Sequence, residues 1–98
     1  MEIYYFQFCC SPFHKSDNFS EYEGAFINCW IKAENKDLAL VIAKNNISDL
    51  QWVIDKLEEQ EVVGAEYYRD NSDGLERYNQ ALLNGSCFVI HTWERKPN

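Results

Sequence analysis

The segment SCFVIHTW (Ser86–Trp93) alternates like a β-strand, but it carries large or apolar side chains on both of its faces. Alternate residues form the two faces: Cys87, Val89, His91 and Trp93 on one, and Phe88, Ile90 and Thr92 on the other. A sheet that helices cover on one side normally presents polar side chains to water on the other side. Something must therefore cover the second face, and this requirement restricts both the fold and the function.

A second strand, Ala25–Ala33, repeats the two-sided pattern. Its row with Ile27 and Ile31 is uniformly apolar, so we expect that row to face the helices and the core. Phe26 and Trp30 then lie on the outer face.

The first strand, Glu2–Cys9, leaves its orientation open. Either the pair Ile3 and Tyr5 or the row Tyr4, Phe6 and Phe8 can point outwards, and both choices are aromatic. In the last strand we assign Phe88 and Ile90 to the core. The candidate partner- or ligand-binding residues on the outer face are Tyr5, Phe26, Trp30, His91 and Trp93.

Two helices are predicted between the strands. Asn35 can cap a helix that runs to about Asn46, and Asp73, with Glu76 three residues later, predicts the start of a second helix that ends before Gly85. Residues 48–63 fit either a helix or a strand. We favour a strand from about Gln51 to Leu57, resuming at Glu61–Val63, because a compact sheet needs a strand between the two helices.

The chain has 98 residues, which is the size of one domain. We therefore predict a single α+β domain over residues 1–98. Its expected architecture is a two-layer sandwich in which a four-stranded, mainly antiparallel sheet has both helices on one face, in the order ββαβαβ.

Three alternatives could cover the outer face of the sheet. The loop Ser11–Gly24, which contains Phe13, Phe19 and Tyr22, could fold over it. A second copy of the chain could pack against it, and this makes a homodimer the expected assembly. A small apolar ligand could instead occupy a cleft there, since exposed apolar patches commonly mark binding sites.

The negative charge is concentrated in one segment. Asp49–Glu76 contains nine acids against two bases and so carries the whole formal charge of −7, while the other residues sum to zero. Such a surface repels phosphate backbones, so nucleic-acid binding is not expected. The segment either keeps the protein soluble or docks a basic protein partner.

Composition also predicts the location of the chain. The start, MEIYYFQFCC, lacks the basic residues and long apolar run of a signal peptide, and no segment has the roughly 18 apolar residues of a membrane span. We therefore expect a cytoplasmic protein whose four cysteines are free thiols. No cofactor is implied, and no metal site, because standard zinc-ligand spacings are absent.

The stretches CWIKAENKDLALVIAKNNISDLQW and ERYNQALLNGSCFVIHTW resemble small, uncharacterised bacterial single-domain α+β proteins, some of which look like products of mobile gene cassettes. The similarity extends over roughly residues 25–93 and is carried mostly by packing positions. It implies a strand at Trp52, and it brings no activity and no functional residues. The matching positions are Trp30, Ala33, Ala39, Ile42, Trp52, Ala81, Gly85 and Trp93.

Three functional hypotheses follow. The favoured one is a non-catalytic binding module of unknown ligand that self-associates through the aromatic sheet face. The second is an acidic inhibitor of a basic protein, like an immunity protein or an antitoxin, that uses Asp49–Glu76. The third is a small enzyme with His91 in an aromatic cleft, since histidine titrates near neutral pH.

Overall fold

A computed structural model describes residues 1–96 of the chain. Within them the order ββαβαβ is confirmed, with a short helix and a 3-10 turn added in the connections. The elements are β1 (Glu2–Pro12), α1 (Asn18–Glu21), β2 (Tyr22–Ala33), α2 (Lys36–Asp49), β3 (Trp52–Val63), η1 (Ala65–Tyr68), α3 (Ser72–Asn84) and β4 (Ser86–Glu94).

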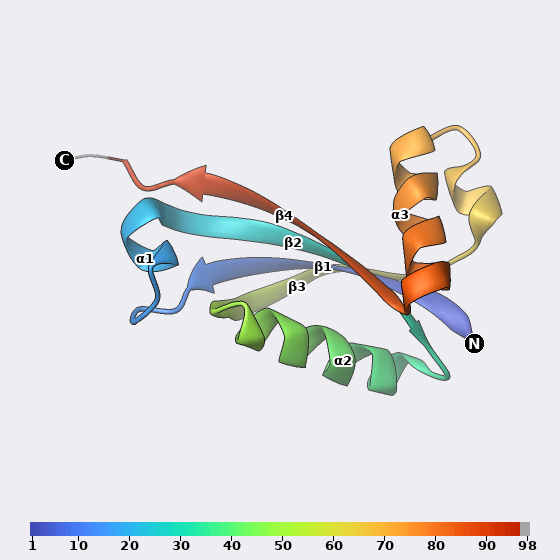
Figure 1. Ribbon diagram of the computed structural model, residues 1–98, viewed down its shortest axis with the longest axis horizontal. Coiled ribbons are helices and arrows are strands. Elements are labelled where there is room, and N and C mark those ends of the chain that lie inside the picture. The colour runs from blue at the N-terminus through green and yellow to red at the C-terminus, as the bar shows by residue number, and fades with distance from the viewer. Residues whose placement is uncertain (97–98) are drawn as a thin grey trace.

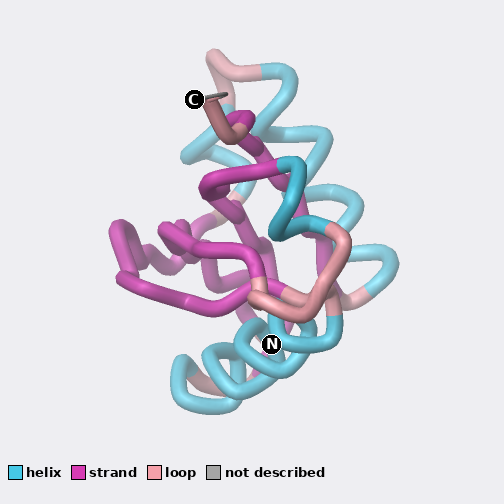
Figure 2. The backbone as a smooth tube through the Cα atoms, turned by 90° about the vertical axis from the view of Figure 1, so that its left-hand side faces the viewer, coloured by secondary structure: helices cyan, strands magenta, loops and turns pink. Residues whose placement is uncertain are grey.

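The four strands form one antiparallel sheet in the order β3-β1-β2-β4, which confirms the predicted α+β class. β1 and β2 are central, and β3 and β4 are the two edges. The molecule is elongated, with extents of 45 × 28 × 21 Å. Figure 2 shows the twisted strands with α2 viewed end-on beneath them.

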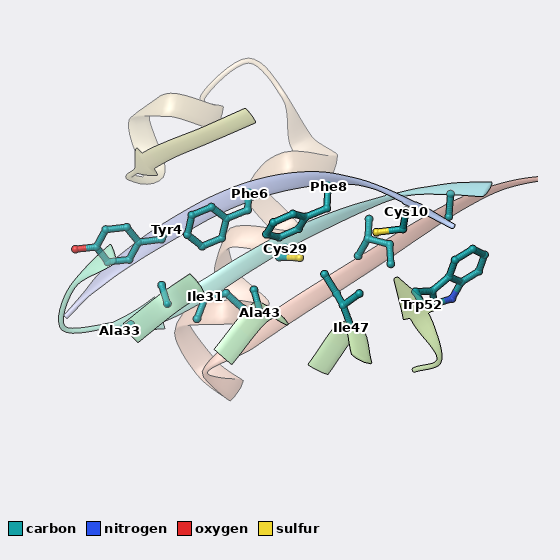
Figure 3. Packing of buried hydrophobic residues seen from close by; sticks show 13 residues of the cluster. Tyr4, Phe6, Phe8, Cys10, Cys29, Ile31, Ala33, Ala43, Ile47 and Trp52 are labelled. Atoms are coloured by element: carbon teal, nitrogen blue, oxygen red, sulfur yellow. The ribbon is translucent and has the colours of Figure 1, made fainter. Parts of the chain in front are cut away.

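The larger core lies between α2 and one face of the sheet. β1 directs Tyr4, Phe6 and Phe8 into this core, and Figure 3 shows their rings on the side of β1 that faces α2. Ile3 and Tyr5 consequently take the other face. This settles the orientation of the first strand, which two equally apolar rows had left open.

α2 begins as predicted. The side chain of Asn35 accepts a hydrogen bond from the Leu38 amide over 2.8 Å and so caps the first turn. Its buried stripe is narrow and mostly small, with Ala39, Ala43 and Ile47 one turn apart. Small side chains let the helix axis approach the sheet closely.

The predicted placement of both helices on one face is wrong. α3 packs on the face opposite α2, near the end of the sheet at which β1 and β4 begin (Figure 1). The physical reason is the second apolar row of the sheet, which includes Ile3, Trp30 and Cys87 and buries itself under α3 rather than staying in water. Each helix therefore forms its own layer with the shared sheet.

Two boundaries also differ from the prediction. The ambiguous stretch is a strand, and it runs without interruption from Trp52 to Val63. α3 is capped by Asn71 rather than Asp73, because the Asn71 side chain accepts from the Gly74 amide over 3.0 Å. The end of α3 is as predicted, with Gly85 in the left-handed conformation at φ 93°.

Candidate functional site

The five predicted site residues share one face of the sheet, the face that carries α3. Tyr5 pairs directly with Trp30 across β1 and β2, and Phe26 pairs with His91 across β2 and β4. Directly opposed residues lie on the same side of an antiparallel pair. Trp93 continues the row of His91 and stacks on Phe26, with 5.3 Å between the ring centroids. What differs between the five residues is how each one is covered.

Trp30 lies on the predicted face of the sheet, but it is buried there. Only 6% of its surface is accessible, because η1 and α3 lie over it. Its indole Nε1–H donates a hydrogen bond of 2.8 Å to the hydroxyl of Tyr68, and its ring lies 5.0 Å from the ring of Tyr5. The chain itself therefore covers this end of the outer face.

Tyr68 is positioned by close packing against the start of α3. A β-carbon on Gly74 would lie 2.8 Å from Cε1 of the Tyr68 ring, which is closer than carbon atoms normally approach. Only glycine lets the ring sit this close to the helix. The Asn71 side chain, which bonds to the Gly74 amide, holds the same corner.

A cleft of about 510 Å³ opens beside this corner, between α3 and the sheet. Tyr5 and Trp30 lie at its base, and Tyr67, which is 60% exposed, offers an accessible ring at its wall. Residues from all four strands, η1 and α3 line it. The full lining is Tyr5, Asn28, Trp30, Glu59, Tyr67, Tyr68, Asn71, Asp73, Gly74, Arg77, Val89 and His91.

Polar groups of both signs surround the aromatic base. The Asn28 side-chain oxygen accepts a hydrogen bond of 3.0 Å from Gln7, which orients the Asn28 amide within the sheet face. Arg77 brings a positive charge from α3, while Glu59 from β3 and Asp73 from α3 bring negative charges. His91, also exposed, completes the lining from β4. The cleft can therefore bind a planar group and hydrogen-bond its edges.

Phe26 and Trp93 lie outside the cleft, on the part of the face that α3 does not cover. Each is 38% exposed. Trp93 also packs over the backbone of Gly24, where a β-carbon would meet its ring. Of the five predicted residues, three therefore line the cleft and two form a separate aromatic pair.

The described residues hold little that points to metal or nucleophilic chemistry. Within residues 1–96, no group of three or more histidine, cysteine, aspartate or glutamate side chains is arranged to hold a metal ion. Cys29 and His91 lie on opposite faces of the sheet, so they cannot form a catalytic pair. Burial raises the pKa of the Cys29 thiol, so a thiolate nucleophile is disfavoured there.

Comparisons with protein-family models, with curated proteins and with solved structures found no match to this chain. The resemblance to gene-cassette products therefore stays a prediction. Among the described residues, no helix is long and apolar enough to cross a membrane.

The residues that form the wall of the cleft were not predicted from the sequence. Tyr67 and Tyr68 lie in a short 3-10 turn, which has no hydrophobic periodicity to mark it. Arg77 was not predicted either, because a single arginine on the polar face of a predicted helix does not indicate a binding site. The available clue was the adjacent tyrosine pair next to the capping residues of α3.

Alkaline pH is expected to destabilise the fold. Burial raises the pKa of Tyr5 from 10.0 to about 12 and the pKa of Cys10 from 9.0 to about 12. The unfolded chain then loses these protons at lower pH than the folded chain, so stability is complete below pH 9 and falls as the pH rises towards about 12. Urea unfolding at several pH values measures this loss. A midpoint that stays constant over this range would contradict it, and Tyr5→Phe should make the decline shallower.

Proposed function

We propose that this chain is a non-catalytic binding module that holds a small planar ligand in the cleft beneath α3. The observation that carries the proposal is the meeting of aromatic rings and polar groups in one cleft. Clefts of a few hundred Å³ with aromatic walls and a few convergent polar groups are typical of small-molecule sites.

The arrangement of the rings supports a planar ligand. Tyr67 is exposed, while Trp30 is held by its hydrogen bond to Tyr68 and cannot turn away. A planar group can lie against Tyr5 and Tyr67, with its edge towards the Asn28 amide. Because the side chains of Trp30 and Tyr68 are already fixed by their hydrogen bond, binding costs little side-chain conformational entropy there.

Charge favours a ligand that carries a positive group. Two acids, Glu59 and Asp73, line the cleft against one permanent cation, Arg77. The surrounding segment Asp49–Glu76 adds a strongly negative field. Exposed tyrosine rings also attract cations through their faces.

Two planar dyes test this preference. We expect cationic thioflavin T to bind more tightly than anionic anilinonaphthalene sulfonate, and Tyr67→Ser to weaken thioflavin T binding about tenfold, or about 1.4 kcal/mol. Fluorescence titration gives both affinities. Phe19→Ser is the matched control, because Phe19 is an exposed ring on α1 that does not line the cleft. Equal binding by wild type and Tyr67→Ser would rule out the cleft as the site.

We further propose that the protein works in the cytoplasm. The four cysteines, Cys9, Cys10, Cys29 and Cys87, are free thiols in the fold, and three of them are buried. Free thiols are typical of reducing compartments. Loss of thioflavin T binding or of the fold in reducing buffer would argue against this location.

A further inference from the structure

The two edges of the sheet are built differently. β3 has two register shifts against β1, and it carries Asp55, Lys56, Glu58, Glu59 and Glu61. Bulges and charges of this kind prevent an edge strand from pairing with another chain. The acidic segment therefore has a structural role at this edge, whether or not it binds a partner.

β4 lacks these protective features. Between Ser86 and Trp93 it contains no proline, lysine, arginine, aspartate or glutamate, and its register with β2 is regular from Ser86 to Trp93. It extends over nine residues. A long, regular and apolar edge of this kind is a template for strand addition.

The backbone of β4 shows which groups are free for pairing. The Lys32 amide donates to the Gly85 carbonyl over 2.9 Å, so Gly85 directs its backbone groups towards β2. Backbone groups alternate in direction along an antiparallel strand. The amide and carbonyl groups of Ser86, Phe88, Ile90 and Thr92 consequently point away from β2, towards the open edge.

Side chains on both faces of β4 are also incompletely covered. Ile90 is 38% exposed on the α2 side, and Trp93 is exposed to the same extent on the α3 side. α3 contacts only the start of the strand, and Arg95 binds back to the carbonyls of Phe19 and Tyr22. Every residue from Ile90 to Glu94 is exposed.

We propose that β4 pairs in antiparallel fashion with β4 of a second copy of this chain, so that two four-stranded sheets join into one continuous sheet. An antiparallel pair of identical strands has two-fold symmetry, which is the commonest symmetry of soluble oligomers. The new hydrogen bonds use the outward backbone amide and carbonyl groups of Phe88, Ile90 and Thr92. The pairing also reduces the exposed surface of Ile90 and Trp93 in both copies.

The charge distribution selects a second copy as the occupant. β4 lies at the opposite edge of the sheet from β3. β3 carries four of the nine acids of Asp49–Glu76: Asp55, Glu58, Glu59 and Glu61. Two chains of charge −7 therefore repel each other least when their β4 edges meet. A basic partner would instead be drawn towards the β3 edge.

Edge pairing also replaces the face-to-face dimer that the sequence indicated. α3 stands on the aromatic face, so two such faces cannot lie flat against each other along their length. Edge pairing leaves α3 and the cleft in place. The proposal is independent of the ligand.

Thr92→Pro tests the proposal, with Thr92→Ala as its matched control. Proline at this position removes an outward amide and leaves the hydrogen bonds to β2 intact. We expect wild type and Thr92→Ala to sediment at twice 11.6 kDa, and Thr92→Pro at 11.6 kDa with unchanged thioflavin T affinity. Thr92→Lys is the second variant, in case Thr92→Pro fails to fold. It keeps the backbone amide but adds a charge at the edge, and it should also give the monomer.

Two results would overturn edge pairing. One is a wild-type mass of 11.6 kDa at every concentration up to about 0.1 mM, since this would place any association in the weak range. The other is a dimer that persists in folded Thr92→Pro and Thr92→Lys, which would place the interface elsewhere. A variant that loses dye binding but keeps the dimer would bear on ligand binding in the cleft and not on edge pairing.

Discussion

Phe8→Ala is expected to lower the free energy of unfolding by about 3–5 kcal/mol, the cost of deleting a fully buried aromatic side chain and leaving a cavity. Phe8 has 0% accessible surface and sits in the middle of the α2 core, 5.9 Å from the ring of Phe6 (Figure 3). Urea unfolding followed by far-UV circular dichroism measures the loss. At this magnitude a small domain loses much of its stability.

Phe26→Ala is the matched control for this experiment. Phe26 is also a strand phenylalanine, but it lies on the opposite face and is 38% exposed. Its removal should cost about 1 kcal/mol, because less apolar surface returns to water. Equal losses for Phe8→Ala and Phe26→Ala would mean that the two faces of the sheet are not covered as described.

Gly74→Ala has the second large expected effect, because it acts on both stability and the cleft. The new methyl group overlaps the Tyr68 ring and must displace it, which also breaks the hydrogen bond from Trp30. Overpacking of this kind costs about 1–3 kcal/mol. We expect a lower urea midpoint, a shifted Trp fluorescence spectrum and loss of thioflavin T binding.

Gly64→Ala provides the control at a second glycine. Gly64 precedes η1, and a β-carbon there has no atom within 4 Å. Its backbone is extended, with φ −125°, so alanine adopts it without strain. Stability and dye binding should be unchanged within about 0.5 kcal/mol. If Gly74→Ala behaved like Gly64→Ala, Tyr68 would not be held against the helix.

Alternation of side chains predicted the strands well. Glu2–Cys9, Ala25–Ala33 and Ser86–Trp93 all lie within strands of the structure, and Phe88 packs against the α2 core as expected. The shared face of Tyr5, Phe26, Trp30, His91 and Trp93 also follows from alternation. These properties depend on local geometry, which a sequence specifies directly.

Alternation could not show which helix covers which face. Both rows of β1 are apolar, so the pattern permits a helix on either side, and only the tertiary packing of α3 against Trp30 decides between them. The start of α3 was misplaced for a similar reason. Asn71 and Asp73 are both good capping residues, and the close contact of Gly74 with Tyr68 selects the earlier one.

Placing the two helices on opposite faces divides the interior into two unequal parts. The α2 core contains thirteen buried residues, whereas the part under α3 contains six, and the sheet separates them. Elements with few buried contacts open at lower free energy than the whole domain unfolds. α3 and η1 can therefore lift as a cooperative unit while β1, β2 and α2 remain folded, giving a molecule in the cleft a route in and out that does not require global unfolding.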